Sequence, residues 1–484
     1  MIQIINGLFQ IIFSIFEALV SGIGELIVSA SASKRKQNYN ADFLPANKLL
    51  SATDAGFCLT GNKCLSIEES FSNAICFGGS GSGKSSRILI PSILKMTESS
   101  LVVHDPSGEL FLKTASAMKQ SGYSIKVLNY TNPDYSENYN PLYRVKTISD
   151  IKKISKLLIH ASLGAGGKDP FWNSSAEGLI TVFIRYITVH AEKEYHTLYN
   201  VLCLINAFSG TPQKIDKLFV KAKDDDLIAD YKAYIAYDAK MLMSIVATAR
   251  TALSIFGDPE VVRITSGDSI DFESFRKDKT ILYINNDVNS MKYYSVLSSI
   301  FFEQFFASVM KQLPVENDVP VFFLLDEASS LFLSILPTAI SNIRKYNSGI
   351  LQIYQSQSQL FDLYGLPQGR NILANSYAKV YMPGQPLETA RELELLLGKF
   401  EYTDDDNTRR IRQLLTMDEI RILKEVIILI GNYQPIKTIM IPYYEQARLK
   451  RLTELAPFTI EPKFFEQEEN QINIDGNEKE EQKV

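Results

Sequence analysis

Short apolar runs alternate with helical patterns along most of the chain, and these runs predict the strands of one sheet. The runs lie at residues 73–77, 100–105, 124–129, 279–284, 319–325, 350–354 and 378–382. Most are apolar at nearly every position, which is typical of strands buried on both faces. Their alternation with helices predicts an α/β fold with a mostly parallel sheet covered by helices. Two further runs, 425–430 and 438–441, are joined across Gly431-Asn432 and predict a closing hairpin.

The alternation stops between about residues 175 and 256, where the pattern becomes helical throughout. The segments 179–184, 198–202 and 241–246 lie in stretches with helical spacing and few turn residues. A stretch of about 80 residues is longer than an ordinary loop. It therefore predicts an all-helical domain inserted into the α/β domain.

The first thirty residues are strongly apolar and lack the basic start of a signal peptide. Their polar residues fall three or four positions apart, on one helical stripe: Gln3, Asn6, Gln10, Ser14, Glu17, Ser21 and Glu25. This pattern fits a helix lying on a membrane, a single span whose stripe faces partner helices, or a soluble oligomerisation helix. Lys34-Arg35-Lys36 follows directly and would lie on the cytoplasmic side of a membrane.

Composition narrows the function classes. The 484 residues are 45% hydrophobic and 22% charged, with a formal net charge of −5 and a pI near 5.7. This balance excludes general positive charge as the basis of nucleic-acid binding, so any DNA contact needs a local stripe or channel. Cys58 and Cys64 have no histidine or second cysteine pair nearby, which argues against a zinc site, and all four cysteines are expected to be reduced cytosolic thiols. The acidic segment 457–484 predicts a disordered tail.

The strongest chemical signal follows the run at 73–77. The sequence there matches G-x-x-x-x-G-K-S, the P-loop signature, which wraps a polyphosphate in backbone N–H groups between a strand and a helix. The candidate nucleotide-binding residues are Gly78, Gly79, Ser80, Gly81, Ser82, Gly83, Lys84, Ser85 and Ser86. Lys84 is placed to reach the β- and γ-phosphates and Ser85 to ligate Mg²⁺, so ATP and Mg²⁺ are the expected cofactors.

Three further residue positions complete a candidate ATPase site. The run at 321–325 ends in Asp326-Glu327, the Walker B pattern, in which Asp326 would hold Mg²⁺ and Glu327 would deprotonate the attacking water. Gln355 ends the next run, the position that contacts the γ-phosphate in RecA-like ATPases. Arg344 lies in a helical stretch between these two runs. It is either a finger that reaches a neighbouring subunit's ATP or an ordinary solvated arginine.

The ordered set of motifs resembles the coupling-protein ATPases of conjugative type IV secretion, the TraG-type family. Besides the P-loop, the segments that carry the resemblance are 104–110 (HDPSGEL), 140–142 (NPL), 169–172 (DPFW), 326–328 (DEA), 343–345 (IRK), 355–360 (QSQSQL), 364–365 (YG), 388–390 (ETA) and 397–398 (LG). They cover about residues 50–445 in the family's order. Ser107 departs from the family, which usually has lysine there. The N-terminus departs as well, because many members have two membrane spans.

The resemblance implies a RecA-like P-loop ATPase that hydrolyses ATP. It would form a homo-oligomeric ring, typically of six subunits, on the cytoplasmic face of the bacterial inner membrane, as a peripheral or single-span protein. The ring would move relaxase-bound DNA, single-stranded, toward a type IV secretion channel. Two alternatives remain: a receptor ATPase for protein effectors, and a nucleotide-gated structural ring that translocates nothing. Family members often recruit cargo through acidic C-terminal segments. The chain then divides into an N-terminal membrane-associated helix (1–36), two halves of a nucleotide-binding domain (37–174 and 263–456), the helical domain (175–262) and the tail (457–484).

Overall fold

The computed structural model of the chain describes residues 39–163, 170–210, 212–285, 288–463 and 471–472. The chain forms two compact units, residues 1–42 with 391–417 and residues 43–390 with 418–484, and each is described by itself. The predicted N-terminal helix at 1–36, with its membrane and oligomerisation alternatives, lies outside the described residues.

The described part of the larger unit contains one nine-stranded sheet. In spatial order the strands are β11 (Ile436–Thr438), β10 (Val426–Ile430), β7 (Ala378–Tyr381), β1 (Ala74–Phe77), β6 (Ser348–Tyr354), β5 (Val321–Leu325), β2 (Ser100–Asp105), β4 (Thr280–Asn285) and β3 (Ser124–Asn129). The strands from β7 to β3 are parallel, whereas β10 and β11 are antiparallel additions at one edge. The predicted α/β fold with a mostly parallel sheet is confirmed. The predicted run at 438–441 shares only Thr438 with β11, because the pairing with β10 runs from Ile436 to Thr438.

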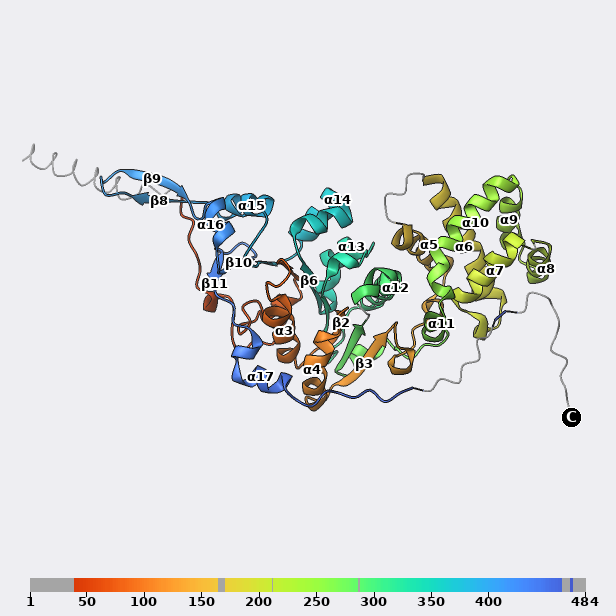
Figure 1. Ribbon diagram of the computed structural model, residues 1–484, viewed down its shortest axis with the longest axis horizontal. Helices are drawn as coiled ribbons and strands as arrows, with labels where there is room; N and C mark the ends of the chain where they lie inside the picture. The colour runs from red at the N-terminus through yellow and green to blue at the C-terminus, as the bar shows by residue number, and fades with distance from the viewer. Residues whose placement is uncertain (1–38, 164–169, 211, 286–287, 464–470, 473–484) are drawn as a thin grey trace, which may run out of the picture. The chain divides into compact units, whose positions relative to one another are not determined.

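Helices cover both faces of this sheet (Figure 1). On one face lie α3 (Ile90–Lys95), α4 (Glu109–Gln120) and α17 (Ala447–Thr453), and on the other α12 (Met291–Val309), α13 (Leu336–Asn342) and α14 (Gln357–Ala374). Phe323 shows why both faces must be covered, since its ring packs edge-on against Phe305 and at a tilt against Phe306 of α12, at 5.4 and 4.4 Å between ring centroids. Its neighbours in the strand, Phe322 and Leu324, belong to the core on the α3 side. Burial on both sides explains why the strands are apolar at nearly every position.

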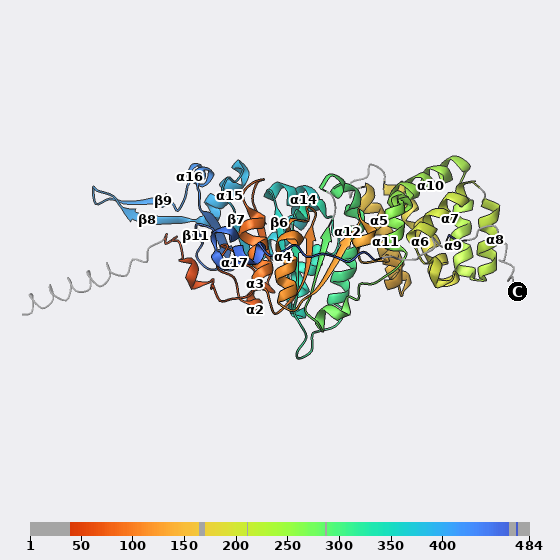
Figure 2. The same cartoon turned by 60° about the horizontal axis from the view of Figure 1, so that its bottom comes forward.

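A helical bundle is inserted between β3 and β4. Its helices are α5 (Ile148–Leu163), α6 (Pro170–His190), α7 (Leu198–Gly210), α8 (Pro212–Ala222), α9 (Asp225–Ile235), α10 (Ala239–Leu253) and α11 (Pro259–Thr265). α6 contacts α5, α7, α9 and α10, as the turned view of the bundle shows (Figure 2). The predicted insertion is present, but the boundary expected at 174/175 falls inside α6. The bundle begins earlier because the apolar face of α5, with Ile151, Ile154 and Leu158 buried, packs on α6 and α10.

One described helical stretch, Ala239–Gly257, is long and apolar enough to cross a membrane, with a mean hydropathy of 1.3. It comprises α10 and the short helix that follows. Ile245, Val246 and Ala249 of α10 are buried, and α10 contacts α5, α6 and α7. Its apolar residues are therefore explained by the core of the bundle.

The described part of the smaller unit is a β-hairpin of β8 (Lys399–Thr403) and β9 (Arg409–Gln413), flanked along β8 by residues 39–41. The sequence pattern does not predict this hairpin. β9 contains Arg409, Arg410 and Arg412, and all three are exposed, so no buried face leaves an apolar signal. The remaining α-helices are α2 (Ile67–Ser70), α15 (Leu387–Leu397) and α16 (Met417–Ile422).

Part of the predicted tail is packed on the protein. Phe458 contacts Phe111 of α4, Lys463 is hydrogen-bonded near β3, and Ile472 is buried. Disorder is therefore the wrong prediction for these described residues, because an acidic average composition hides single residues that have partners. The rest of the tail, 464–470 and 473–484, lies outside the described residues.

Candidate functional site

The P-loop leaves β1 at the carboxyl edge of the sheet and turns into the helix that begins at Ser85. Gly81 and Gly83 have φ angles of 75° and 83°, which residues with a Cβ rarely adopt. At Gly83 a Cβ would also lie 1.9 Å from Arg87 Nη1. That guanidinium donates to Ser82 O at 3.0 Å and so fixes the loop from the helix side.

The loop fits a polyphosphate in three respects. Open space surrounds the positions that a Cβ would take at Gly79 and Gly81, so the backbone is approachable there. The buried hydroxyl of Ser82 has no hydrogen-bond partner among the described residues. Lys84 Nζ donates to Gly78 O at 2.7 Å and Gly79 O at 3.1 Å, so the ammonium lies against the loop that phosphates would occupy. These are the features of an anion site at the start of a helix.

The sheet order brings the predicted residues together. β6 lies between β1 and β5, and all three are parallel. The carboxyl end of β1 leads into the P-loop, that of β6 into Gln355, and that of β5 into Asp326. The site therefore lies at one sheet edge, where ligands bind in open parallel sheets. Only the strand order, which differs from the sequence order, creates this meeting point.

A direct hydrogen bond joins the predicted general base, Glu327, to Gln355, the residue predicted to contact the γ-phosphate. Gln355 Nε2 donates to Glu327 Oε1 at 2.7 Å, and Ser329 Oγ donates to the same oxygen at 3.3 Å. Glu327 has a φ of 49° and a ψ of 50°, a left-handed conformation that costs a non-glycine residue on the order of 1 kcal/mol. The Glu327 backbone keeps this conformation, and two donors hold its carboxylate in one orientation.

Buried titratable side chains lie close together beside the P-loop. Burial, with the neighbouring Asp105 and Glu327 carboxylates, raises the pKa of Asp326 to about 7. Burial likewise raises the pKa of Asp105 to about 6. His104 is buried and neutral, because burial lowers its pKa to about 4, and its Nδ1–H donates to Asp326 O at 2.6 Å. A cation bound at Asp326 would relieve this repulsion, so the donor set suits Mg²⁺.

Without nucleotide, this charge should make stability depend on pH. The pKa values of Asp326 and Asp105 are raised above their ordinary 3.8, so these groups lose protons in the folded state alone as pH rises from 6.5 to 8. These two carboxyl groups should lower the free energy of unfolding by about 1 kcal/mol over this window. His104 offsets part of this fall, because its lowered pKa keeps it neutral in the folded state while the unfolded histidine still loses about half a proton above pH 6.5, so the net fall should be about 0.5 kcal/mol. Urea unfolding at the two pH values would measure the change. Asp326→Asn should remove most of it, and equal pH dependence in this variant would contradict the assignment.

Arg344 lies at the amino ends of the parallel strands, opposite the carboxyl ends that carry the site. It is exposed in the short helix η10 (Ile343–Tyr346), which precedes β6, whereas Gln355 follows β6. β6 has seven residues, so its two ends lie about 20 Å apart. The structure thus brings together every predicted site residue except Arg344, which is too distant to act on the ATP of its own subunit.

Two residues at the site have no assigned role in the sequence prediction. Asp105 is the last residue of β2, the strand next to β5, and its Oδ2 accepts from the N–H of Phe111 in α4 at 2.8 Å. A second apolar run ending in aspartate is the signal that could have indicated it. Gln385 Nε2 donates to Phe77 O at 3.0 Å and Met382 O at 2.6 Å, and so holds the start of the P-loop. No sequence pattern identifies Gln385.

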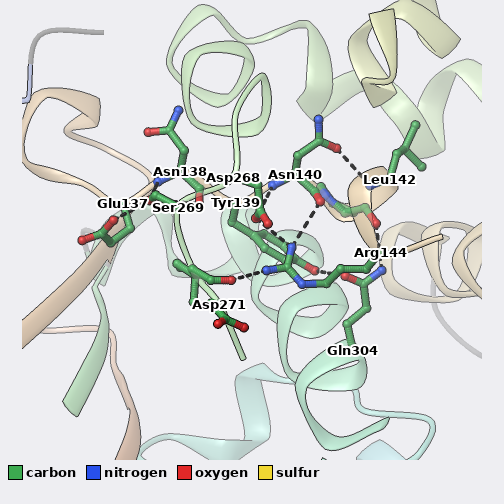
Figure 3. Close-up of polar contacts among 12 residues, drawn as sticks. Glu137, Asn138, Tyr139, Asn140, Leu142, Arg144, Asp268, Ser269, Asp271 and Gln304 are labelled. Carbon is green, nitrogen blue, oxygen red and sulfur yellow. Dashed lines mark hydrogen bonds and ion pairs between the residues drawn. The ribbon is translucent and has the colours of Figure 1, made fainter. Parts of the chain in front are cut away.

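The 140–142 motif lies where the chain passes between the sheet domain and the bundle (Figure 3). Arg144 Nη1 donates to Asp268 Oδ1 at 2.7 Å, which joins the outgoing crossing to the returning one. The Asn140 N–H donates to the same Asp268 oxygen at 3.3 Å, and Asn140 Nδ2 donates to His196 O of the bundle at 2.8 Å. The motif therefore has a structural role at the junction.

A second contact links the site to the bundle. Phe332 lies in the loop that follows Glu327, and its ring stacks on His160 of α5 at 6.4 Å between centroids. The Phe332 ring also stacks on Tyr364 of α14, at 5.8 Å between centroids. Movement of the loop after Glu327 would thus be felt directly by the first helix of the bundle.

Comparison with known proteins identifies the family of this chain. The family profile described as "Type IV secretory system Conjugative DNA transfer" matches residues 25–474. The chain belongs to this family. It is 25% identical over 396 residues to Protein VirD4 of Rhizobium radiobacter, covering 77% of this chain and 57% of the relative. It is 25% identical over 303 residues to the probable conjugal transfer protein TraG of Sinorhizobium fredii, covering 61% and 47%. The chain thus spans about half the length of the curated relatives it matches.

Solved structures of a conjugative coupling protein are similar in fold. The bacterial conjugative coupling protein TrwBdeltaN70, in a trigonal form with sulphate, aligns with a TM-score of 0.65 and 18% identity, covering 84% of this chain and 95% of that chain. A structure of TrwB in complex with ADP and Mg²⁺ aligns equally well, with a TM-score of 0.65 and 18% identity over 84% and 95% of the two chains. This similarity supports the fold prediction, including the helical bundle beside the sheet.

Proposed function

We propose that the chain is an ATP-driven DNA translocase, a coupling protein that delivers relaxase-bound DNA to a conjugative type IV secretion channel. Family membership supports the role in conjugative transfer. The observation that carries the hydrolytic part is the hydrogen bond between Gln355 and Glu327, at one sheet edge with the P-loop. A loop that only bound nucleotide would not need a carboxylate fixed by a second side chain.

ATP and Mg²⁺ are the proposed ligands of the site. TrwB, the structural neighbour, is seen with ADP and Mg²⁺ and with a non-hydrolysable ATP analogue. In this chain the loop from Gly78 to Ser86 would hold the phosphates, and Ser85 and Asp326 would hold the metal. Mg²⁺ bound there would neutralise charge on the β- and γ-phosphates.

Each side chain has a defined task in the proposed reaction. Lys84 exchanges its two carbonyl partners for phosphate oxygens. Glu327 accepts the proton of the attacking water, acting as a general base. Gln355 holds Glu327 in direction, and loss of the γ-phosphate near Gln355 would alter this hydrogen bond. The change would pass through the loop that follows Glu327 to Phe332 and His160, and so to the bundle.

The proposal includes a ring of subunits in which Arg344 of one subunit acts on the ATP of its neighbour. An arginine at the sheet edge opposite its own site suits action on the site of a neighbouring subunit. The ring is proposed to be a hexamer at the cytoplasmic face of the inner membrane, attached through residues 1–36. Its partners are then DNA, with the relaxase, and components of the secretion channel.

The test measures ATPase rate against DNA and protein concentration, with oligomer mass determined in parallel. Single-stranded DNA should raise the rate of the assembled ring severalfold, and the same preparation of Glu327→Gln should show no stimulation, which excludes a contaminating ATPase. Stimulation by secreted proteins with no response to either form of DNA would favour the receptor for protein effectors. The absence of turnover in a confirmed ring would favour the structural gate.

A further inference from the structure

The C-terminal segment after α17 follows the sheet domain closely. Ser116 Oγ of α4 donates to Ala456 O at 2.5 Å. Phe458 packs edge-on against Phe111 of the same helix, at 6.3 Å between ring centroids. The segment is therefore held along α4 by a hydrogen bond and a ring contact.

Lys463 fixes the end of this segment beside β3. Its N–H donates to Asp134 O at 2.7 Å, and its Nζ lies 2.5 Å from Glu137 Oε1. Both partners belong to the stretch that leads from β3 toward the bundle. The tail thus reaches the junction between the sheet domain and the bundle.

The next described residues of the tail lie on the bundle itself. The Ile472 N–H donates to Asn200 Oδ1 at 2.9 Å, and the Ile472 residue is only 9% exposed. Gln471 Nε2 lies 3.7 Å from Cys203 Sγ. Asn200 and Cys203 are three residues apart on α7, so they share one helix face. Two consecutive tail residues therefore occupy neighbouring positions on α7.

Hydrogen bonds within the bundle orient the surface that receives the tail. Asn200 Nδ2 donates to Tyr195 O at 3.0 Å, which leaves its Oδ1 directed to the tail. The next carbonyl, of His196, accepts from Asn140 Nδ2 at 2.8 Å. The docked tail is therefore connected through Asn200, Tyr195 and His196 to Asn140, which belongs to the network between the two domains in Figure 3.

We propose that α7, around Asn200 and Cys203, is a docking site for an extended peptide, and that the free protein fills it with its own residues Gln471 and Ile472. Docked in this way, the tail is a third connection between the sheet domain and the bundle, beside the two chain crossings. It latches the bundle in one position.

The latch would respond to whatever binds the end of the tail. The acidic residues beyond it, 478–481, include three glutamates. A basic partner that binds these acidic residues would compete with docking of Gln471 and Ile472 at α7. By thermodynamic linkage, binding of the partner then favours release of the bundle, and release of the bundle favours binding of the partner. Burial of an isoleucine side chain favours the docked state by about 10- to 100-fold, a bias that such a partner can reverse.

Disulfide trapping tests the docking. In full-length Gln471→Cys, mild oxidation with diamide should join the new thiol to Cys203 within one chain, because the other three cysteines are buried. The product should migrate as a monomer on a non-reducing gel, with the cross-linked peptide identified by mass. Adding Cys203→Ser should abolish the product, and Glu461→Cys, on an exposed residue of the same segment, should give none. Failure to form the bond, or a bond between two chains, would overturn docking within the chain.

Hydrogen exchange tests the latch. Ile472→Asp should raise the exchange rate of the α7 amides severalfold and lower the trapping rate in the Gln471→Cys background by about tenfold. Thr459→Asp adds the same charge to an exposed position of the same segment and should change neither. Equal α7 exchange in Ile472→Asp and the parent protein would show that the tail restrains nothing. Neither measurement depends on ATP or DNA.

Discussion

Glu327→Gln should bind ATP normally and lose turnover by about 10²- to 10⁴-fold, the usual contribution of a general base. The amide keeps the shape of the side chain and can still form a hydrogen bond to Gln355, but it cannot take a proton from water. Binding of a fluorescent ATP analogue and the steady-state rate of phosphate release would separate the two effects.

Two further variants sharpen this result. Gln355→Ala leaves the carboxylate in place but removes its 2.7 Å donor, so a smaller loss of turnover is expected, again with normal ATP binding. Glu316→Gln changes an exposed glutamate in the loop before β5 and should behave as the parent protein. Turnover near that of the parent in Glu327→Gln would remove Glu327 as the base.

Arg344→Ala should reduce the ATPase rate of the assembled ring by about 10³- to 10⁵-fold, as expected for the loss of an arginine finger. The physical reason is the placement of Arg344 at the far end of β6 from its own site, so that its charge can act only on the site of another subunit. Lys345→Ala is the matched control, since it removes the next exposed charge on the same turn. ATP affinity and oligomer mass should be unchanged in both variants.

Mixed rings distinguish a finger from an ordinary surface arginine. Arg344→Ala subunits keep a complete P-loop, and Lys84→Ala subunits keep the arginine but lose the phosphate contact. Co-assembly should restore activity at interfaces where an intact P-loop faces an intact Arg344. Mixtures that stay as inactive as the separate variants, with subunit exchange confirmed, would favour the solvated-arginine interpretation.

Much of the fold could be predicted because each buried strand carries its own signal. β2 and β3 match the predicted runs 100–105 and 124–129 at both ends. The β8–β9 hairpin could not be predicted, since exposed strands need no apolar pattern and Arg409 to Arg412 resemble a solvated loop. The start of the bundle was also hidden, because α5 belongs to it through packing on α6 and not through any break in the sequence.

The motifs of the candidate site could be located in the sequence for a different reason. A P-loop binds phosphate with consecutive backbone groups, so its chemistry lies within nine residues, from Gly78 to Ser86. Asp326 and Glu327 likewise mark the end of an apolar strand. The charge on Asp326 was not predictable, because it depends on Asp105, which lies more than 200 positions earlier and becomes its neighbour only when β2 pairs with β5.

The sequence by itself determined the buried strands, the P-loop motif and the carboxylates that follow the strand at 321–325, because these depend on neighbouring positions in the chain. The tertiary structure decided which of them meet. It placed β6 between β1 and β5, so that Gln355 holds Glu327 beside the P-loop, and it left Arg344 at the opposite edge. It also placed Ile472 on Asn200, a contact across 272 residues. Such contacts follow from strand order and packing of the whole chain, and no local pattern of residues encodes them.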